Sequence, residues 1–266
     1  MSKSLKISDG ISVIMPTYKR PEGLKIALTS LLEQQTSALA LEIIIADNDP
    51  AGSAKPYVER IAKAAKTPIV YLHVPQPGVS NARNGALAIA QGRYIAWLDD
   101  DQDAAPNWIN AMLTACESLQ ASLVFCPTHA RIPNADKYEK FYYNFFSRFG
   151  PEIEEGVIED FFGAGNSFMD LHKCDMPSPV FDPAANETGG EDDMLFGHIQ
   201  DHGGVMAWTR STIVHEDIRP HRATPSYVRI RSFAFGQSPS EMAYDRQDKI
   251  GIVKWMCVGI ASRPLL

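Results

Sequence analysis

Three adjacent carboxylates follow an apolar stretch of the chain. The run 93–98 is mostly apolar and predicts a buried strand, and Asp99, Asp100 and Asp101 come directly after it. Adjacent carboxylates repel one another and stay ionised together only where a cation joins them. Mg²⁺ and Mn²⁺ take oxygen ligands and keep coordination positions open for phosphate oxygens. The residue types and their spacing therefore predict a divalent-metal site for a phosphate-bearing ligand.

Two other interpretations of these acids are open. The first is a solvated acidic loop in which Asp103 caps a helix that begins near Pro106. The second is a calcium loop of the EF-hand type, because acids alternate at positions 99, 101 and 103. That loop requires a glycine where Ala104 stands and a bidentate glutamate where Asn110 stands. The calcium loop is therefore disfavoured, whereas the solvated loop remains an alternative.

Composition limits the classes of protein to consider. The chain has 266 residues, enough for one large domain, and 45% of them are hydrophobic, enough for a core. The net charge of −7, with no Lys/Arg tract, argues against a nucleic-acid partner. The four cysteines have no zinc or redox spacing, which predicts reduced core thiols in a cytoplasmic protein. The sequence shows no apolar signal region and no run that would span a bilayer.

Apolar runs alternate with amphipathic segments through the first half of the chain. The predicted strands are 11–15, 41–46, 69–74, 93–98 and 122–125. The helices between them are predicted to begin near Pro21, Ala54, Gly78 and Trp108. This alternation predicts an α/β fold with a mostly parallel sheet covered on both faces. Ligands bind beyond the carboxyl ends of such strands, so polar residues that follow the strands should converge at one edge.

Several of these polar residues suit a nucleotide. Asp47 offers an acceptor for a nucleobase imide N–H, and Tyr18 offers a ring to pack against the base. The segment 80–84 offers helix N-terminal amides and Arg83 for diphosphate oxygens. Each feature also has a structural reading, as a turn at 47–50 or a helix cap. Gly-x-Gly-x-x-Gly and phosphate-loop motifs are absent, which argues against a nicotinamide or flavin enzyme and against a P-loop ATPase.

Five motifs in order between residues 11 and 236 resemble those of family 2 glycosyltransferases. They are the segments 11–18, 47–48, 78–84, 97–101 and 189–193. The family resemblance, suggestive also of bacterial exopolysaccharide glucosyltransferases, implies a nucleotide-sugar-dependent enzyme. It implies the GT-A fold, a Rossmann-like, mostly parallel sheet flanked by helices, with a smaller acceptor-side half. One departure is Asp49-Pro50, where many members have Gly-Ser, and it alters the turn that follows Asp47.

The resemblance also implies a role for each matching residue. The implied donor-binding residues are Pro16, Tyr18, Arg20, Asp47, Arg83, Asp99 and Asp100. The implied metal ligands, for Mn²⁺ or Mg²⁺, are Asp101 and His215. Asp192 matches the general base, with Glu191 or Asp193 orienting the acceptor. A structural alternative exists for these last three acids, because carboxylates in the first turn of a helix are favoured by the helix dipole. The loop 163–166 is expected near the donor sugar.

We expect residues 1–236 to form a single GT-A glycosyltransferase domain. Within it, 11–127 would bind the nucleotide sugar and 128–236 would form the acceptor half. The tail 237–266 is rich in apolar residues and includes Trp255. It suits either packing or an interfacial membrane contact.

The predicted function is inverting, metal-dependent transfer of a sugar from a nucleotide sugar. The expected donor is UDP-linked, and the acceptor is a saccharide or lipid-linked saccharide in polysaccharide biosynthesis. The expected location is the cytoplasm, with peripheral contact at the inner face of the cell membrane. One alternative is a sugar-phosphate nucleotidyltransferase. That enzyme needs a Gly-rich loop with an arginine after the first strand, and the segment 15–18, Met-Pro-Thr-Tyr, is not such a loop. Another is a non-catalytic sugar-nucleotide or glycan-binding module.

Overall fold

The computed structural model describes residues 8–35, 39–132, 138–187, 189–235, 243–244 and 247–261. The chain forms two compact units. Unit 1 consists of residues up to 129 together with 147–216, and unit 2 consists of 130–146 together with the residues from 217 onward. The predicted assignment of 11–127 to the donor and 128–236 to the acceptor stays a prediction.

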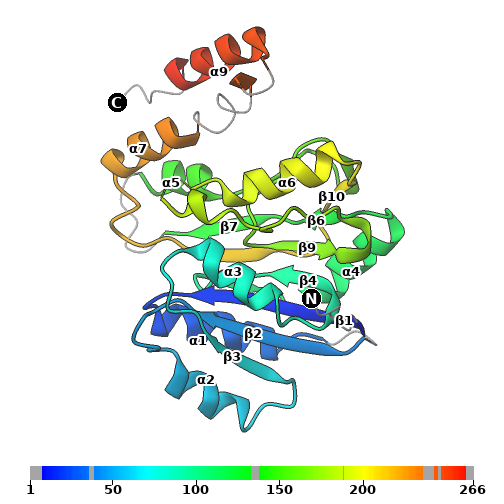
Figure 1. Ribbon diagram of the computed structural model, residues 1–266. Helices are drawn as coiled ribbons and strands as arrows, with labels where there is room; N and C mark the ends of the chain where they lie inside the picture. The colour runs from blue at the N-terminus through cyan, green and yellow to red at the C-terminus, as the bar shows by residue number, and fades with distance from the viewer. Residues whose placement is uncertain are drawn as a thin grey trace. The chain divides into compact units, whose positions relative to one another are not determined.

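Unit 1 contains an eight-stranded sheet (Figure 1). Its strands, in spatial order, are β3 (Ile69–His73), β2 (Leu41–Asp47), β1 (Ser8–Thr17), β4 (Gly92–Trp97), β9 (Ser167–Asp170), β6 (Leu123–Phe125), β10 (Met206–Thr209) and β8 (Glu155–Ile158). The pairs among β3, β2, β1 and β4 are parallel, as is the pair of β6 with β10. The strands β8 and β9 pair antiparallel with their neighbours. The predicted α/β class with a mostly parallel sheet is confirmed.

Helices cover both faces of this sheet. Their bounds are α1 (Pro21–Leu32), α2 (Lys55–Ala62), α3 (Val79–Leu87), α4 (Trp108–Ser118) and α6 (Glu191–Asp201), with short 3₁₀ turns at Leu171–Lys173 and Pro183–Asn186. One core cluster joins the sheet to α1, α2 and α4, and a second joins it to α3 and α6. Along β1, Val13 and Met15 enter the first cluster and Ile14 the second, as the two-residue period of a strand requires.

A second sheet has the order β5 (Gln102–Ala104), β11 (Val214–Asp217) and β7 (Thr128–Arg131). In the antiparallel pair of β5 and β11, His215 lies opposite Asp103 and Glu216 opposite Gln102. Directly opposed residues place their side chains on the same face, and successive residues alternate between faces. His215 and Glu216 therefore point to opposite sides of this sheet.

Unit 2 contains three described helices, α5 (Glu139–Phe146), α7 (Pro225–Phe235) and α9 (Lys249–Ala261). In the aromatic-rich α5, Tyr142 is buried whereas Phe141 is exposed. In α9, Ile250 and Val253 are exposed. No helix within the described residues is both long and apolar enough to cross a membrane. Of the predicted tail, residues 237–242, 245–246 and 262–266 lie outside the described residues.

Candidate active site

The carboxyl ends of β1 and β4 are joined through Asp100. This carboxylate is buried and accepts hydrogen bonds from Thr17 Oγ1 at 2.7 Å and from the Tyr18 amide at 3.3 Å. Nη1 of Arg20 donates to Asp100 Oδ1 at 2.6 Å. Burial raises the pKa of Asp100, and Arg20 opposes that rise. With its oxygens used inside the protein, Asp100 fixes the two strand ends relative to each other.

Asp101 lies in an excess of negative charge. The same Nη1 atom of Arg20 contacts Asp101 Oδ2 at 2.6 Å. Burial raises the pKa of Asp101 to about 7, and the carboxylates of Asp99 and Glu216 add to that rise. Burial alone would lower the pKa of Arg20, but Asp100 and Asp101 outweigh it and raise that pKa. One guanidinium is therefore shared between two carboxylates and does not offset the whole cluster.

These residues fit a divalent cation. Repulsion among Asp99, Asp101 and Glu216 is what a bound cation would relieve, and their oxygens are the ligands that Mg²⁺ and Mn²⁺ prefer. Glu216 was not predicted from the sequence; it lies on the face of β11 opposite to His215. The His215 ring lies 6.2 Å from that of His129. The role of His215 as a metal ligand stays a prediction. The carboxylate of Glu216, in contrast, acts on Asp101 by raising its pKa.

Arg83 connects the β4 acids to α6. Its side chain is 5% exposed, Nη1 donates to Glu191 Oε1 at 2.6 Å, and Nη2 lies 3.4 Å from Asp99 Oδ1. Burial would lower the pKa of Arg83, but Asp99, Asp192 and Glu191 raise it. The predicted donor, base and acceptor residues thus meet around one buried guanidinium.

The helix N-terminal amides expected to hold diphosphate oxygens are partly used by the protein itself. The Gly78 amide donates to Asn48 Oδ1 at 2.9 Å, and the Ser80 amide donates to Asn186 Oδ1 at 2.9 Å. Gly78 has a positive φ of 117°, and a Cβ there would collide with the Asn186 amide group. At the N-terminus of α3, Asn186 thus occupies one of the places that we expected a phosphate to take.

Asp192 lies in the first turn of α6, between Glu191 and Asp193. Its Oδ2 accepts a hydrogen bond from the Ala164 amide at 3.0 Å, and its Oδ1 accepts one from the Asp193 amide at 3.1 Å. Asp192 and Asp193 are half-buried, whereas Glu191 is buried against Arg83. Burial and the nearby Asp192 raise the pKa of Glu191, and Arg83 opposes that rise. Asp192 is therefore the more accessible of the first two acids and has an oriented carboxylate.

The glycine loop 163–165 lets these carboxylates approach the backbone. A Cβ on Gly165 would collide with the carboxylate of Asp99. A Cβ on Gly163 would lie 3.1 Å from both Arg148 Nη1 and Asp192 Oδ2, so these two groups are neighbours. Arg148 also contacts Glu216 at 3.3 Å. Sequence patterns did not single out Arg148, which adds a partly exposed cation to the site.

Asn166 differs from its expected place near the donor sugar. It is buried, its Oδ1 accepts a hydrogen bond from Trp108 Nε1 at 2.9 Å, and its Nδ2 donates to Thr128 Oγ1 at 2.9 Å. A further hydrogen bond runs from its Nδ2 to the carbonyl oxygen of Cys126 at 2.8 Å. Asn166 thus anchors the end of the glycine loop in the core.

The residues predicted for the nucleoside divide into exposed and buried ones. Tyr18 is 52% exposed, and Pro16 is half-buried. Asp47 is fully buried, and its carboxylate accepts hydrogen bonds from the Asp49 amide, the Ala54 amide and the Tyr71 hydroxyl at 2.9–3.0 Å. These contacts show the turn-forming role of Asp47, and its contact with a nucleobase stays a prediction.

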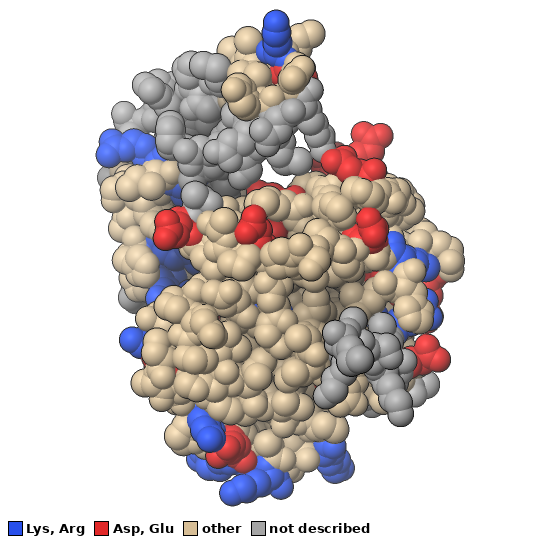
Figure 2. Space-filling model, viewed as in Figure 1, with Lys and Arg blue, Asp and Glu red and all other residues tan. Residues whose placement is uncertain are grey.

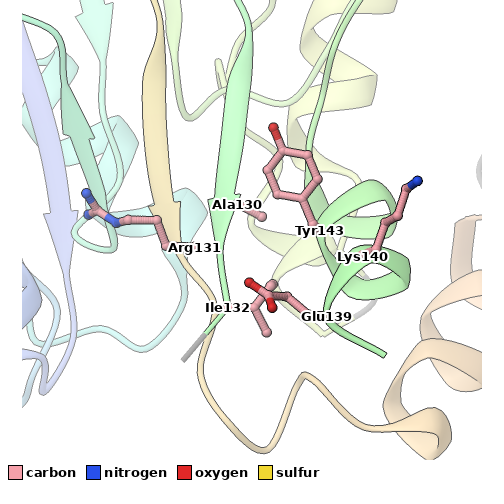
Figure 3. Close-up of a pocket in the computed structure, with 6 residues that line it drawn as sticks. All are labelled: Ala130, Arg131, Ile132, Glu139, Lys140 and Tyr143. Atoms are coloured by element: carbon pink, nitrogen blue, oxygen red, sulfur yellow. The ribbon is translucent and has the colours of Figure 1, made fainter. Parts of the chain in front are cut away.

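Unit 2 has a separate hollow of about 550 Å³ (Figure 3). It is lined by Ala130, Arg131, Ile132, Glu139, Lys140 and Tyr143. The Arg131 side chain points away from the others in this view, and its Nε contacts Asp217 at 2.7 Å. None of these lining residues was predicted as a site residue.

Comparisons with known proteins identify the family and the fold. The family model of glycosyl transferase family 2 matches residues 12–173. The succinoglycan biosynthesis protein ExoM of Rhizobium meliloti (strain 1021) is 29% identical over 238 residues, which cover 89% of this chain and 76% of that protein. S. aureus TarS 1-349 in complex with UDP-GlcNAc has a TM-score of 0.59 at 14% identity, over 95% of this chain and 73% of that one.

A second solved structure, GalNAc-T7 with UDP, GalNAc and Mn²⁺, has a TM-score of 0.59 at 13% identity. The match covers 88% of this chain and 51% of that one. These similarities confirm the predicted GT-A fold. The family match extends over more than half of the chain and includes the β4 acids and Arg83. The chain belongs to glycosyltransferase family 2, and the protein is a glycosyltransferase.

Proposed function

We propose that the protein is an inverting, divalent-metal-dependent transferase that moves a sugar from a UDP-sugar to a saccharide or lipid-linked saccharide in polysaccharide biosynthesis. The observation that carries this proposal is the chain of contacts from Asp99 through Arg83 to Glu191, which holds the β4 acids and Asp192 in one cluster. The donor class is supported by the UDP-GlcNAc complex of TarS, and the pathway by the name of ExoM.

Asp192 is the general base in this proposal. The acceptor hydroxyl gives its proton to Asp192 while its oxygen attacks the anomeric carbon C1 of the donor sugar. The bond from C1 to the phosphate oxygen breaks, and the nucleoside diphosphate leaves with the bonding electron pair. A general base must lie within hydrogen-bond reach of the proton it takes, so its carboxylate has to be held in a fixed orientation. The hydrogen bond from the Ala164 amide orients the carboxylate of Asp192 and so supports this role.

The leaving nucleotide carries the developing negative charge. Asp101, with Asp99 and Glu216 beside it, would hold Mn²⁺ or Mg²⁺, and the ion when bound neutralises diphosphate oxygens. Arg148 is partly exposed and lies beside Asp192, so it offers a further cation to the diphosphate. Arg83 is too buried for more than a limited contact, although its Nε has no hydrogen-bond partner among the described residues. Its main role is to hold Asp99 and Glu191.

The nucleoside would lie over Tyr18, whose ring is exposed beside Lys19 at 5.2 Å from its ammonium. Figure 2 shows Lys and Arg side chains dispersed over the visible face, with Asp and Glu among them. The net charge of −7 supports a small donor rather than a nucleic acid. The exposed apolar residues of α9 support the proposed peripheral membrane contact, which would bring a lipid-linked acceptor to the enzyme.

A donor-hydrolysis and transfer assay tests the base. Asp192→Asn should abolish transfer while UDP still raises the melting temperature in the presence of Mn²⁺. Asp193→Asn, one position along the same helix turn, is the matched comparison: it removes an acid expected to orient the acceptor, so it should raise the KM for the acceptor and keep most of kcat. Normal turnover by Asp192→Asn would contradict the proposal. A protein that binds UDP and transfers no sugar to any acceptor would instead favour the non-catalytic module.

A further inference from the structure

Two histidines and a carboxylate meet at the C-terminal end of α6. His198 and His202 are four residues apart on one face, and their rings stack with centroids 4.0 Å apart and an interplanar angle of 27°. The Oδ2 atom of Asp175 lies 3.4 Å from His198 Nε2 and 3.8 Å from His202 Nε2. All three ligand atoms lie within 4.8 Å of one another.

These separations match those of a metal coordination sphere. Zinc is bound at about 2.0–2.1 Å by imidazole nitrogen and carboxylate oxygen in tetrahedral geometry, so neighbouring ligand atoms are roughly 3.3 Å apart. The Asp175 oxygen is at that separation from His198 and slightly beyond it from His202. The exposed side chains of Asp175 and His202 can turn toward a shared ion, which would then have three protein ligands. Water would take the fourth position.

The tautomer of His202 also suits a ligand. Its Nδ1 lies 2.8 Å from the carbonyl oxygen of His198, so Nδ1 carries the proton and Nε2 has its lone pair directed elsewhere. A hydrogen bond from the second ring nitrogen to a carbonyl is the usual outer support of a metal-bound histidine. His198 Nε2 is shielded from solvent and has no hydrogen-bond partner among the described residues. The neutral His202 therefore offers the Nε2 lone pair to a cation, and the buried Nε2 of His198 is in position to offer a second one.

We propose that Asp175, His198 and His202 form a second metal site, suited to Zn²⁺ and separate from the proposed catalytic cluster. Imidazole ligands favour Zn²⁺ over Mg²⁺, which prefers oxygen alone. The site lies at the opposite end of α6 from Asp192, and an 11-residue helix is about 16 Å long. The ion would therefore take no part in the chemistry proposed at Asp192. It ties the segment that contains Asp175 to the helix that presents the proposed base.

Equilibrium dialysis of the untagged protein against Zn²⁺ tests the site. Excess Mg²⁺ is kept in the buffer to occupy the carboxylate cluster at Asp101, and bound zinc is measured by elemental analysis. We expect one equivalent of zinc to bind. His202→Ala and the conservative Asp175→Asn should weaken its affinity by roughly 100-fold. His172→Ala removes an exposed histidine outside the site and is the matched control.

Two further measurements distinguish loss of the site from loss of the fold. Zinc should raise the melting temperature of the wild-type protein and of His172→Ala by roughly 5 °C at 100 times the dissociation constant, and should not raise that of His202→Ala. Co²⁺ should give the visible absorption of a tetrahedral site in the wild-type protein and in His172→Ala, and not in His202→Ala. Far-ultraviolet circular dichroism verifies that each variant is folded. Equal zinc binding by folded wild type, His202→Ala and Asp175→Asn would overturn the proposal, as would no binding by wild type.

Discussion

Two runs of three acids meet in the active site, and they are built alike although one follows a strand and the other begins a helix. After β4, Asp100 is buried against Arg20 while Asp101 faces the excess charge. At the start of α6, Glu191 is buried against Arg83 while Asp192 stays half-buried. In each run an arginine holds one buried acid, and the proposed chemistry falls to a neighbour; the runs differ in that Asp101 shares Arg20 with Asp100. The arginines therefore position the reactive groups, and the two kinds of acid should respond differently to substitution.

The largest effect should come from the reactive acid of the second run. Asp192→Asn keeps the shape of the side chain but removes its ability to accept a proton. We expect a loss of about 10²–10⁴-fold in turnover, the range for a positioned general base. Initial rates under saturating donor and acceptor measure this, with Asp193→Asn as the comparison for an acid that only orients the acceptor. A loss of kcat in Asp193→Asn as large as that in Asp192→Asn would mean that Asp192 is not the base.

The anchoring pair should show its effect in stability. Arg83→Met leaves the buried Glu191 without its cation and should lower the free energy of unfolding by about 3–5 kcal/mol. The double variant Arg83→Met/Glu191→Gln removes both charges and should regain a large part of that loss. Urea denaturation measures both. If the double variant is no more stable than the single one, the pair does not anchor α6 as described.

The fold could be predicted from the sequence further than the site could. Strand and helix periodicity identified the sheet, and the motif order identified the family. The sequence could not predict which acid of each run is buried. The answer depends on where Arg20 and Arg83 lie in space. Arg148 and Glu216 carry no motif of their own. Glu216 becomes visible only once the register of β11 against β5 is known.

Long-range caps were equally hidden from sequence reasoning. Asn186 Oδ1 accepts a hydrogen bond from the Ser80 amide, 106 residues away in the sequence. No local pattern at the N-terminus of α3 indicates this contact. Asn166 was expected at the ligand because of its neighbouring glycines, but its positive φ of 72° and core hydrogen bonds place its amide inward. Residues of one type and spacing can thus serve packing or chemistry, and the partners decide between the two.

The pH dependence of stability sharpens the comparison for the first run. The pKa of Asp101 is about 7 in the folded protein, above its ordinary value of 3.8, so the neutral form favours folding. This contribution is present below about pH 4 and is lost as the pH rises through 7. In the metal-free protein, Asp101→Asn should therefore be more stable than wild type at about pH 8. The free energy of unfolding of Asp101→Asn minus that of wild type should rise by about 2 kcal/mol between about pH 4 and about pH 8.

Urea denaturation in the presence of a chelator measures this difference. Asp103→Asn is a suitable control. Glu216, which raises the pKa of Asp101, lies opposite Gln102, and Asp103 lies on the other face of β5. Saturating Mn²⁺ should abolish the advantage of Asp101→Asn, since the ion stabilises the ionised wild-type carboxylate. A stability difference that does not change with pH would mean that Asp101 is not held in the field of Asp99 and Glu216.

The smallest expected effect is a difference in Mn²⁺ affinity between variants of Glu216 and His215, which are neighbours on β11. Glu216→Gln removes a carboxylate that faces Asp101, so we expect it to weaken Mn²⁺ binding about tenfold, the lower range for changes around a metal site. His215→Ala removes a ring on the opposite face of the strand and should change Mn²⁺ affinity less. Titration of Mn²⁺ followed by electron paramagnetic resonance measures both affinities. The reverse order would make His215 the ligand and would mean that the strand turns when the metal binds.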